Sequence, residues 1–303
     1  MNAPATDITV AVATCGRPHA LARCLTALAA GTLLPPEVIV VDQSPTPEAR
    51  HAALTVSGLC VRYLEQQRLG LSASRNLALV TATTPLLAVT DDDCVPQQGW
   101  VEALDDAFAR EPRPAAVTGS IVSLGNRPPG MHPVSLRTST TLRDHVGRML
   151  PWRAGSGANF AAPLALLRRL GGWDQRLGVG SPGRAAEDSD LIYRILRAGG
   201  IVRYDPAAIV AHDWQSWSRR LDARWSYGYG IGALCGSWLR CGDPYALRML
   251  AAYVPSRGHR LASAVLRRDR RQAAEYSRAL SAVAPGLLYG LRAPRRSPGE
   301  GLS

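Results

Sequence analysis

The chain has 303 residues, of which 46 % are hydrophobic and 19 % are charged, so it can bury a core and is not intrinsically disordered. Its net charge is +11 at pH 7 and all 35 basic residues are arginine, which excludes a P-loop lysine and a Schiff-base lysine. Its six cysteines form no CxxC pair and no cluster with zinc spacing, which favours a reducing cytosol and argues against structural zinc.

Strands and helices alternate along the first 125 residues. Pro18 suits the first turn of a helix, Gly31 suits the end of that helix, and Ser72 is positioned to cap a later one. This alternation predicts an α/β fold with a mostly parallel, Rossmann-like sheet flanked by helices. The expected strands cover residues 8–14, 37–42, 85–93 and 115–124, and the expected helices cover residues 17–31, 70–80 and 99–112.

Polar residues follow three of these strands. Thr14 ends the first strand, Asp42 ends the second, and Asp91, Asp92 and Asp93 close the run "LLAVTDDD". Ligands of α/β sheets bind outside the carboxyl ends of the strands, so we expect these side chains to line one crevice. Three adjacent carboxylates repel each other, and we therefore expect positive charge among them.

The second half of the chain is less regular. Residues 125–151 are rich in turn-forming and polar residues and predict a long loop over the site. A helix is expected over residues 187–198, followed by two short strands on either side of an Asp205-Pro206 turn. Beyond Trp214 the pattern indicates helices, and residues 292–303 are expected to fray.

Neither a leader nor a membrane span is recognisable. The start "MNAPATDITV" has no basic region followed by an apolar stretch, and the longest uncharged runs fall short of the ~20 residues that a spanning helix needs. Charge is concentrated in the tail, because 15 arginines and 6 acids follow from Asp213 onward, a net charge of +9 out of +11. No nucleic-acid-binding module accompanies this charge.

Seven fragments occur in an order that resembles a known family: "VAVATCGRP", "VIVVDQS", "GLSASRNLAL", "VTDDDCVPQQGW", "GANFA", "GGWDQRLG" and "AEDSDLIYRILRAGG". They resemble the family-two nucleotide-sugar glycosyltransferases, which have the GT-A fold, and the resemblance covers about residues 7–215. It implies a nucleotide-sugar-binding half over residues 1–125 and an acceptor-binding, catalytic half of the same domain over residues 126–215. Residues 216–303 are then a helical, basic appendage.

The resemblance implies a reaction. A sugar passes from a nucleotide diphosphate donor to an acceptor hydroxyl with inversion, assisted by Mn²⁺ or Mg²⁺. A UDP-sugar is favoured over dTDP and GDP donors, and the acceptor is expected to belong to glycolipid, surface polysaccharide or natural-product synthesis. The "QxxRW" motif of processive synthases is not found, which favours single additions. The alternatives are a sugar-nucleotide nucleotidyltransferase and a catalytically degenerate binding protein.

The family's DxD motif corresponds to Asp91 and Asp93, with Asp93 as the direct metal ligand. Side chains two apart share a face of a strand, so Asp92 is expected to point elsewhere, toward the nucleotide. A hard divalent cation between carboxylates and diphosphate oxygens would supply the positive charge expected there. His212 stands where relatives carry a metal-binding histidine. The alternative is that His212 is a core residue whose ring nitrogens are hydrogen-bonded within the protein.

The family's "ED" motif corresponds to Glu187 and Asp188. By this resemblance Asp188 is the base that removes the acceptor proton, with Glu187 beside it. The alternative is that Glu187, Asp188 and Asp190 only complement the helix dipole. Asp190 is expected to face away or to cap the helix.

Substrate contacts are implied for seven further positions. Asp42 can accept a hydrogen bond from a base imide, and Arg75 can reach base or phosphate, unless it is an ordinary surface cation. Trp173 can contact the acceptor or, alternatively, belong to the hydrophobic core. The expected nucleotide contacts are Thr14, Arg17, Asp42, Arg75 and Asn76, and the expected acceptor contacts are Asn159 and Trp173.

The basic tail has two interpretations. Its arginine-rich and leucine-rich segments can lie peripherally on an anionic membrane, which would place a cytoplasmic enzyme at the inner face of the plasma membrane. Alternatively, they form a helical appendage packed on the catalytic domain, with solvated arginines outside.

Overall fold

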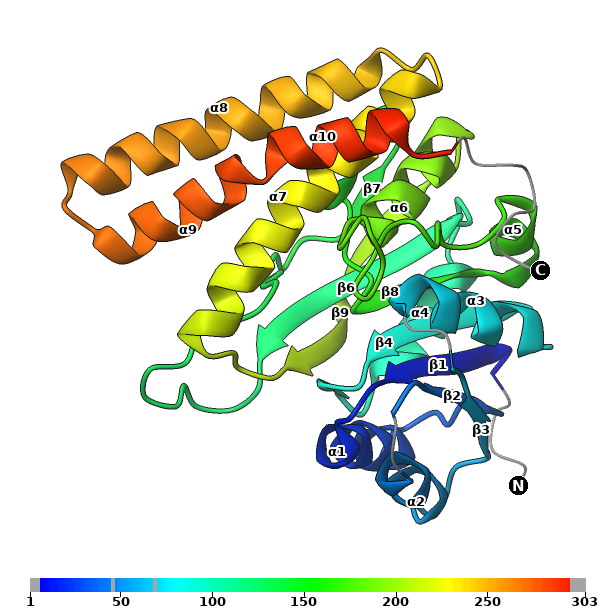
Figure 1. Cartoon of the computed structure of the whole chain (residues 1–303). Coiled ribbons are helices and arrows are strands. Elements are labelled where there is room, and N and C mark those ends of the chain that lie inside the picture. The colour runs from blue at the N-terminus through cyan, green and yellow to red at the C-terminus, as the bar shows by residue number, and fades with distance from the viewer. Residues whose placement is uncertain (1–5, 45–46, 68–69, 295–303) are drawn as a thin grey trace.

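The computed structural model describes residues 6–44, 47–67 and 70–294. Its amino-terminal part is built from four parallel strands with helices between them (Figure 1). Three of these strands, β1, β2 and β4, are runs of mostly buried apolar residues, as expected for strands inside a parallel sheet. The elements are β1 (Ile8–Thr14), α1 (Pro18–Ala29), β2 (Val38–Asp42), α2 (Glu48–Leu54), β3 (Val61–Glu65), α3 (Leu71–Thr81) and β4 (Leu86–Asp91).

The remaining strands extend the same sheet. Strand β8 pairs antiparallel to both β4 and β6, whereas β6 and β9 run parallel. Within the described residues the order is β3-β2-β1-β4-β8-β6-β9-β5, with β7 also on β9. The elements are β5 (Cys94–Pro96), α4 (Trp100–Ala109), β6 (Ala116–Ser123), β7 (Arg143–His145), a 3₁₀ turn (Pro151–Arg153), β8 (Asn159–Pro163), α5 (Leu164–Arg169), α6 (Glu187–Arg197) and β9 (Val202–His212).

Strand β9 differs from the prediction of two short strands. Its partner register passes from Gly119↔Asp205 directly to Ser120↔Ile209, so the residues after Asp205 bulge out while the strand continues. The Asp-Pro dipeptide that indicated a turn therefore marks a bulge, a position where proline is tolerated in a sheet.

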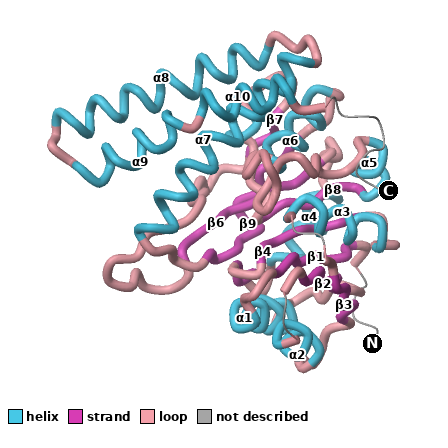
Figure 2. The backbone as a smooth tube through the Cα atoms, in the orientation of Figure 1, coloured by secondary structure: helices cyan, strands magenta, loops and turns pink. Residues whose placement is uncertain are grey.

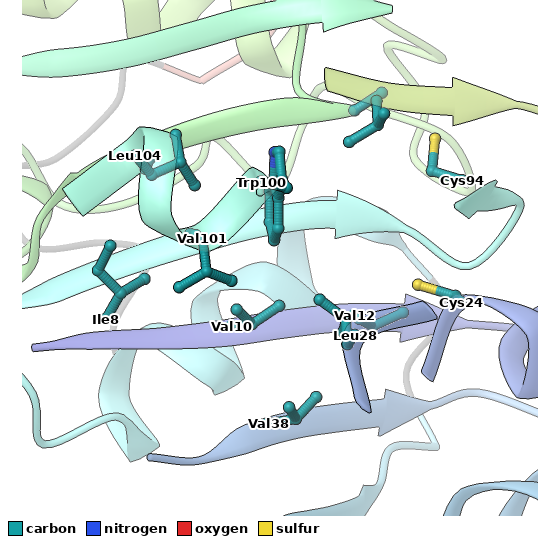
Figure 3. Packing of buried hydrophobic residues seen from close by; sticks show 14 of the residues in the cluster. Ile8, Val10, Val12, Cys24, Leu28, Val38, Cys94, Trp100, Val101 and Leu104 are labelled. Carbon is teal, nitrogen blue, oxygen red and sulfur yellow. The ribbon is translucent and has the colours of Figure 1, made fainter. Parts of the chain in front are cut away.

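Two apolar cores cover the two faces of the sheet. Side chains alternate along each strand, so Val10 and Val12 enter one core while Ala11 enters the other. Figure 3 shows Trp100 and Leu104 of α4 with Val10 and Val12 in the first core. The second core contains α3, α5 and α6 residues.

Four helices follow the sheet: α7 (Trp217–Arg240), α8 (Tyr245–Leu266), α9 (Arg270–Ser281) and α10 (Val283–Arg292). Figure 2 shows them to one side of the layer of strands. Helices α7 and α10 approach closely because Gly232 and Gly286 face each other's backbone, where a Cβ would collide. None of the helices in the described ranges is both long and apolar enough to cross a bilayer.

One predicted cap is wrong. The Ser72 hydroxyl donates to the carbonyl oxygen of Leu177 at 2.7 Å and does not cap α3, whose N-cap is Gly70. The predicted frayed end covers residues 292–303. Of these, Arg292 is the last residue of α10, and residues 295–303 lie outside the described residues.

Candidate active site

The three aspartates lie where β4 ends and the chain turns into β5. Asp91 is the last residue of β4, and Asp92 and Asp93 form the turn. Strand β5 pairs antiparallel with β9, so that Cys94 lies opposite His212. As a result, one ligand atom from each of Asp91, Asp93, Cys94 and His212 lies within 4.8 Å of the others.

Three of these four groups fit a divalent cation. Asp91 and Asp93 offer carboxylate oxygens, and His212 offers a ring nitrogen, Nε2, which lies 3.6 Å from Asp93 Oδ1. Mn²⁺ accepts both oxygen and imidazole ligands. Cys94 fits poorly, because it lies in the apolar core and burial raises the pKa of its thiol well above the ordinary value (Figure 3).

Asp92 belongs to a different group of side chains. It is fully buried, and it accepts hydrogen bonds from Thr14 Oγ1 at 2.7 Å and from Arg17 Nε at 3.0 Å. Burial raises the pKa of Asp92 to about 6, although the charge of Arg17 acts in the opposite direction. Thr14 and Arg17 thus contact Asp92, and Arg17 connects Asp92 to Asp93.

Two arginines supply part of the positive charge expected among the aspartates. Arg17 pairs with Asp93, Nη1 to Oδ2, at 2.5 Å, and also with Asp92. Arg75 pairs with Asp91, Nη2 to Oδ1, at 3.0 Å. A divalent cation is therefore not the sole source of compensation for these carboxylates, which corrects the expectation from the sequence.

Arg75 also joins the two acidic motifs. Its side chain is buried, and Nη1 donates to Glu187 Oε1 at 3.0 Å while Nη2 donates to Gly157 O at 3.1 Å. It is not a surface cation. Burial, together with the charge of Asp188, raises the pKa of Glu187 above its ordinary value, and the charge of Arg75 opposes this. Arg75 thus contacts the DxD and ED acids at once.

Asp188 is the second residue of α6, after Glu187, and is half-buried. Its Oδ2 accepts from the backbone N–H of Gly157 at 2.9 Å, and Oδ1 accepts from Ser189 N at 2.6 Å. A Cβ at Gly157 would lie 2.6 Å from Arg75 Nη1, so a larger residue there would displace the Arg75 guanidinium. The carboxylate is therefore held by backbone donors and retains an exposed portion.

Helix α7 fixes the segment that precedes the ED acids, which the sequence did not indicate. Arg184 and Ala186 have φ values of 65° and 73°, in the left-handed region that non-glycine residues rarely adopt. A Cβ at Gly230 of α7 would lie 2.7 Å from the carbonyl carbon of Ala185. The Arg184 guanidinium lies over the Trp225 ring at 4.9 Å.

Asp190 does not cap α6, and its carboxylate is turned toward α7. It is buried, and it accepts hydrogen bonds from Arg194 Nε at 2.8 Å and from Trp238 Nε1 at 3.0 Å. Asp190 therefore ties α6 to α7, which is a structural role.

At the end of β2, Asp42 is buried and accepts from the backbone N–H of Ser44 at 2.8 Å and from the Tyr63 hydroxyl. Burial, with the hydrogen bond to Asp42, raises the pKa of Tyr63. Gln43, which the sequence reasoning missed, donates to Gly70 O at 3.2 Å and thereby joins β2 to the start of α3.

Three predicted substrate contacts are in the interior instead. Asn159 is fully buried, and its amide accepts from Trp100 Nε1 at 2.9 Å and donates to two backbone oxygens. Asn76 and Trp173 are buried together, joined by Trp173 N to Asn76 Oδ1 at 2.7 Å and by Asn76 Nδ2 to Trp173 O at 2.8 Å. The amide of Asn159 and the ring of Trp173 thus lie in the interior of this structure, and their contact with an acceptor stays a prediction.

Comparisons with known proteins agree with this geometry. Residues 9–169 match the profile of Glycosyl transferase family 2. A pre-mycofactocin glycosyltransferase of Mycobacterium tuberculosis is 34 % identical over 171 residues, which are 54 % of this chain and 34 % of that protein. A probable glycosyltransferase of Bacillus subtilis, YdaM, is 34 % identical over 76 residues, which are 24 % of this chain and 16 % of that protein. The chain thus spans about a third or less of the length of these relatives.

Solved structures share the fold. The mannosyltransferase PcManGT from Pyrobaculum calidifontis, in complex with GDP-Man and Mn²⁺, superposes with a TM-score of 0.61 at 19 % identity, covering 94 % of this chain and 88 % of that one. GalNAc-T7 with UDP, GalNAc and Mn²⁺ gives a TM-score of 0.52 at 19 % identity, covering 69 % and 43 %. The profile match extends over more than half of the sequence, from β1 through α5, and the chain belongs to Glycosyl transferase family 2.

Proposed function

We propose that the chain is an inverting, metal-dependent glycosyltransferase that moves one sugar from a nucleotide diphosphate donor to an acceptor hydroxyl. The single observation that carries the proposal is the arrangement of two carboxyl groups around Arg75, with Asp91 on one side and Glu187, next to Asp188, on the other. The arrangement supports the proposal because a candidate metal ligand, Asp91, and a candidate base, Asp188, then belong to one site.

The donor side is assigned to the ends of β1, β2 and β4. Asp91, Asp93 and His212 would hold Mn²⁺ or Mg²⁺, which when bound supplies positive charge against the charge that develops on the leaving diphosphate. Arg17 lies beside Asp93 and can also contact phosphate oxygens. Asp42 and Thr14, buried at the ends of β2 and β1, are the proposed base and ribose contacts.

The acceptor side is assigned to the start of α6. Asp188 takes the proton of the acceptor hydroxyl as that oxygen attacks the anomeric carbon, opposite the leaving group. Its backbone donors, the N–H groups of Gly157 and Ser189, keep the carboxylate oriented. Arg75 pairs with Glu187 and so compensates the charge of one of the two adjacent acids of the motif.

Donor identity is open among UDP-, GDP- and dTDP-sugars. The two solved structures with this fold contain GDP-Man in one case and UDP in the other. Several nucleotide donors should therefore be screened. The acceptor hydroxyl is proposed to belong to a glycolipid, a surface polysaccharide or a natural product.

The test is to incubate the purified chain with each donor and Mn²⁺ and to identify the nucleotide product by chromatography. The proposal expects free nucleoside diphosphate, formed by transfer or by slow donor hydrolysis, and its loss in Asp93→Ala. Release of pyrophosphate would show nucleotidyl transfer, and binding of a donor with no product in any condition would show a degenerate binding protein. Either result overturns the proposal.

A further inference from the structure

One face of α8 is apolar and exposed along its whole length. Leu247, Val254, Val265 and Leu266 are exposed by 57 %, 38 %, 60 % and 84 %. Leu247, Val254 and Val265 are spaced seven and eleven residues apart and therefore share one side of the helix, whereas Leu266, the last residue of α8, lies about 100° further round. The opposite side carries the buried residues of α8, including Met249 and Tyr253. In Figure 1, α8 runs along the outer edge of the C-terminal helices.

Small and apolar residues fill the positions between these four. Ala251 and Ala262 lie at intermediate turns of the helix, and a Cβ at Gly258 would meet nothing within 4 Å. The described residues thus leave this stripe uncovered. Exposed apolar surface of this extent costs free energy in water, because large aliphatic side chains gain from burial.

Positive charge surrounds the stripe. Residues 245–271 contain seven arginines and a single acid, Asp269, a net charge of +6. The turn from α8 into α9 is the densest part, where Arg267, Arg268, Arg270 and Arg271 are exposed beside Leu266. An exposed leucine at the tip of a basic hairpin is a combination typical of surfaces that enter the interface of an anionic bilayer.

A basic cavity lies at the other end of α8. It has a volume of about 310 Å³, and it lies between the segment around Leu150 and the first turns of α8. Three arginines, Arg148, Arg153 and Arg248, line it together with apolar side chains. Arg148 is paired with Asp243 at 3.3 Å, whereas the guanidinium groups of Arg153 and Arg248 can donate charge-assisted hydrogen bonds to a phosphate headgroup.

We propose that this face of α8 docks onto an anionic phospholipid bilayer. The α8 surface is defined by Leu247, Val254, Val265 and Leu266 with the exposed arginines Arg248, Arg267, Arg268 and Arg270. The apolar residues enter the headgroup boundary and the arginines contact lipid phosphates. A second copy of this chain fits the surface less well, because two faces with the same net positive charge would repel.

The proposal is independent of the glycosyltransferase reaction and is tested without substrate. The full chain is sedimented with phosphatidylcholine vesicles that contain, or lack, phosphatidylglycerol. We expect binding to the anionic vesicles, weakened at about 1 M salt, where the Debye length is ~3 Å. Equal binding to both vesicle types, or to neither, overturns the proposal.

Two pairs of variants locate the contact. Leu266→Glu should weaken vesicle binding by about tenfold or more, whereas Leu54→Glu, at a position exposed by 55 % on α2, should not change it. Arg267→Gln should weaken binding by about fivefold, and the exposed Arg169→Gln should not. Neither position is buried, so the fold should survive, which melting curves check. Self-association that is lost in Leu266→Glu would identify a second copy as the occupant and would contradict the proposal.

Discussion

Arg75 and Glu187 form a buried ion pair of 3.0 Å between residues 112 positions apart in the chain. The same guanidinium reaches Asp91 at 3.0 Å. One side chain of α3 thus connects the end of β4, where the candidate metal ligands lie, with the start of α6, where the candidate base lies. The stability of the site therefore depends on the Arg75 guanidinium, which pairs with an acid of each motif.

The first prediction concerns this cation. Arg75→Met leaves two carboxylates without their partner and should lower the free energy of unfolding by about 3–5 kcal/mol, the usual cost of breaking a buried pair. Glu187→Gln should cost less than half as much, because the glutamine oxygen still accepts from Arg75 and repulsion from Asp188 is removed. Denaturant melts measure both changes. Arg169→Met, at an exposed position, is the control, and an equal effect of Arg75→Met and Arg169→Met would refute the prediction.

The second prediction concerns the base. Asp188→Asn keeps the size of the side chain and its contact with Gly157 but cannot accept the proton, so turnover should fall by about 10²-fold or more while donor affinity is unchanged. Initial rates and equilibrium titrations with the donor separate the two quantities. Unaltered turnover would remove Asp188 from the mechanism.

The third prediction concerns the contact between α7 and the segment before the ED acids. Gly230→Ala places a methyl group against the backbone of Ala185, so the segment or the helix must shift, at a cost of about 1–3 kcal/mol. Turnover should fall while metal-dependent nucleotide binding persists, because the donor side is separate from this contact. Gly258→Ala is the matched control, since its methyl group enters open space, and helix propensity should stabilise that variant by up to about 1 kcal/mol. Matching losses of turnover in both variants would contradict the role given to α7.

The fourth prediction concerns pH and the C-terminal helices. Burial of Glu275 opposes its ionisation, but hydrogen bonds from Arg220 and Arg224 and their charges prevail, and the pKa of Glu275 is lowered below its ordinary value. A lowered folded-state pKa stabilises the protein above the unfolded-state value and ceases to do so as pH falls through the folded-state value.

The stability advantage of the parent protein over Glu275→Gln should therefore be full above about pH 5 and shrink as the pH falls below the ordinary glutamate pKa of about 4.3. Urea melts across this range measure the difference. An advantage that grows toward acid pH would reverse the sign and contradict the assignment.

Some elements could be predicted from local pattern alone. The runs that became β1, β2 and β4 are continuous and apolar because both faces of each strand are buried. Strand β3 lies at the sheet edge with half-exposed residues, and its weak pattern did not indicate a strand. The Asp205-Pro206 dipeptide predicted a turn, but it lies inside β9, where pairing with β6 continues on both sides of a bulge.

The site was predictable only in part. The position of Asp91 and Asp93 beside His212 follows from a resemblance and from strand ends meeting at one edge of the sheet. The partners of Arg75 and the burial of Asn159 depend on contacts between residues far apart in sequence, for which local spacing carries no signal. The role of Gly230 is likewise a matter of tertiary packing.

The central claim is that Asp91 and Asp93 bind a divalent cation together with a nucleotide diphosphate. Calorimetric titration of UDP, GDP and dTDP into the chain, with and without Mn²⁺, tests it most directly, with Asp93→Ala as the variant and the exposed Asp106→Ala as its control. The account predicts that at least one nucleotide binds much more tightly with Mn²⁺, and that Asp93→Ala alone abolishes this dependence. Nucleotide binding that is indifferent to Mn²⁺ in the parent protein, or a metal dependence that survives in Asp93→Ala, would contradict it.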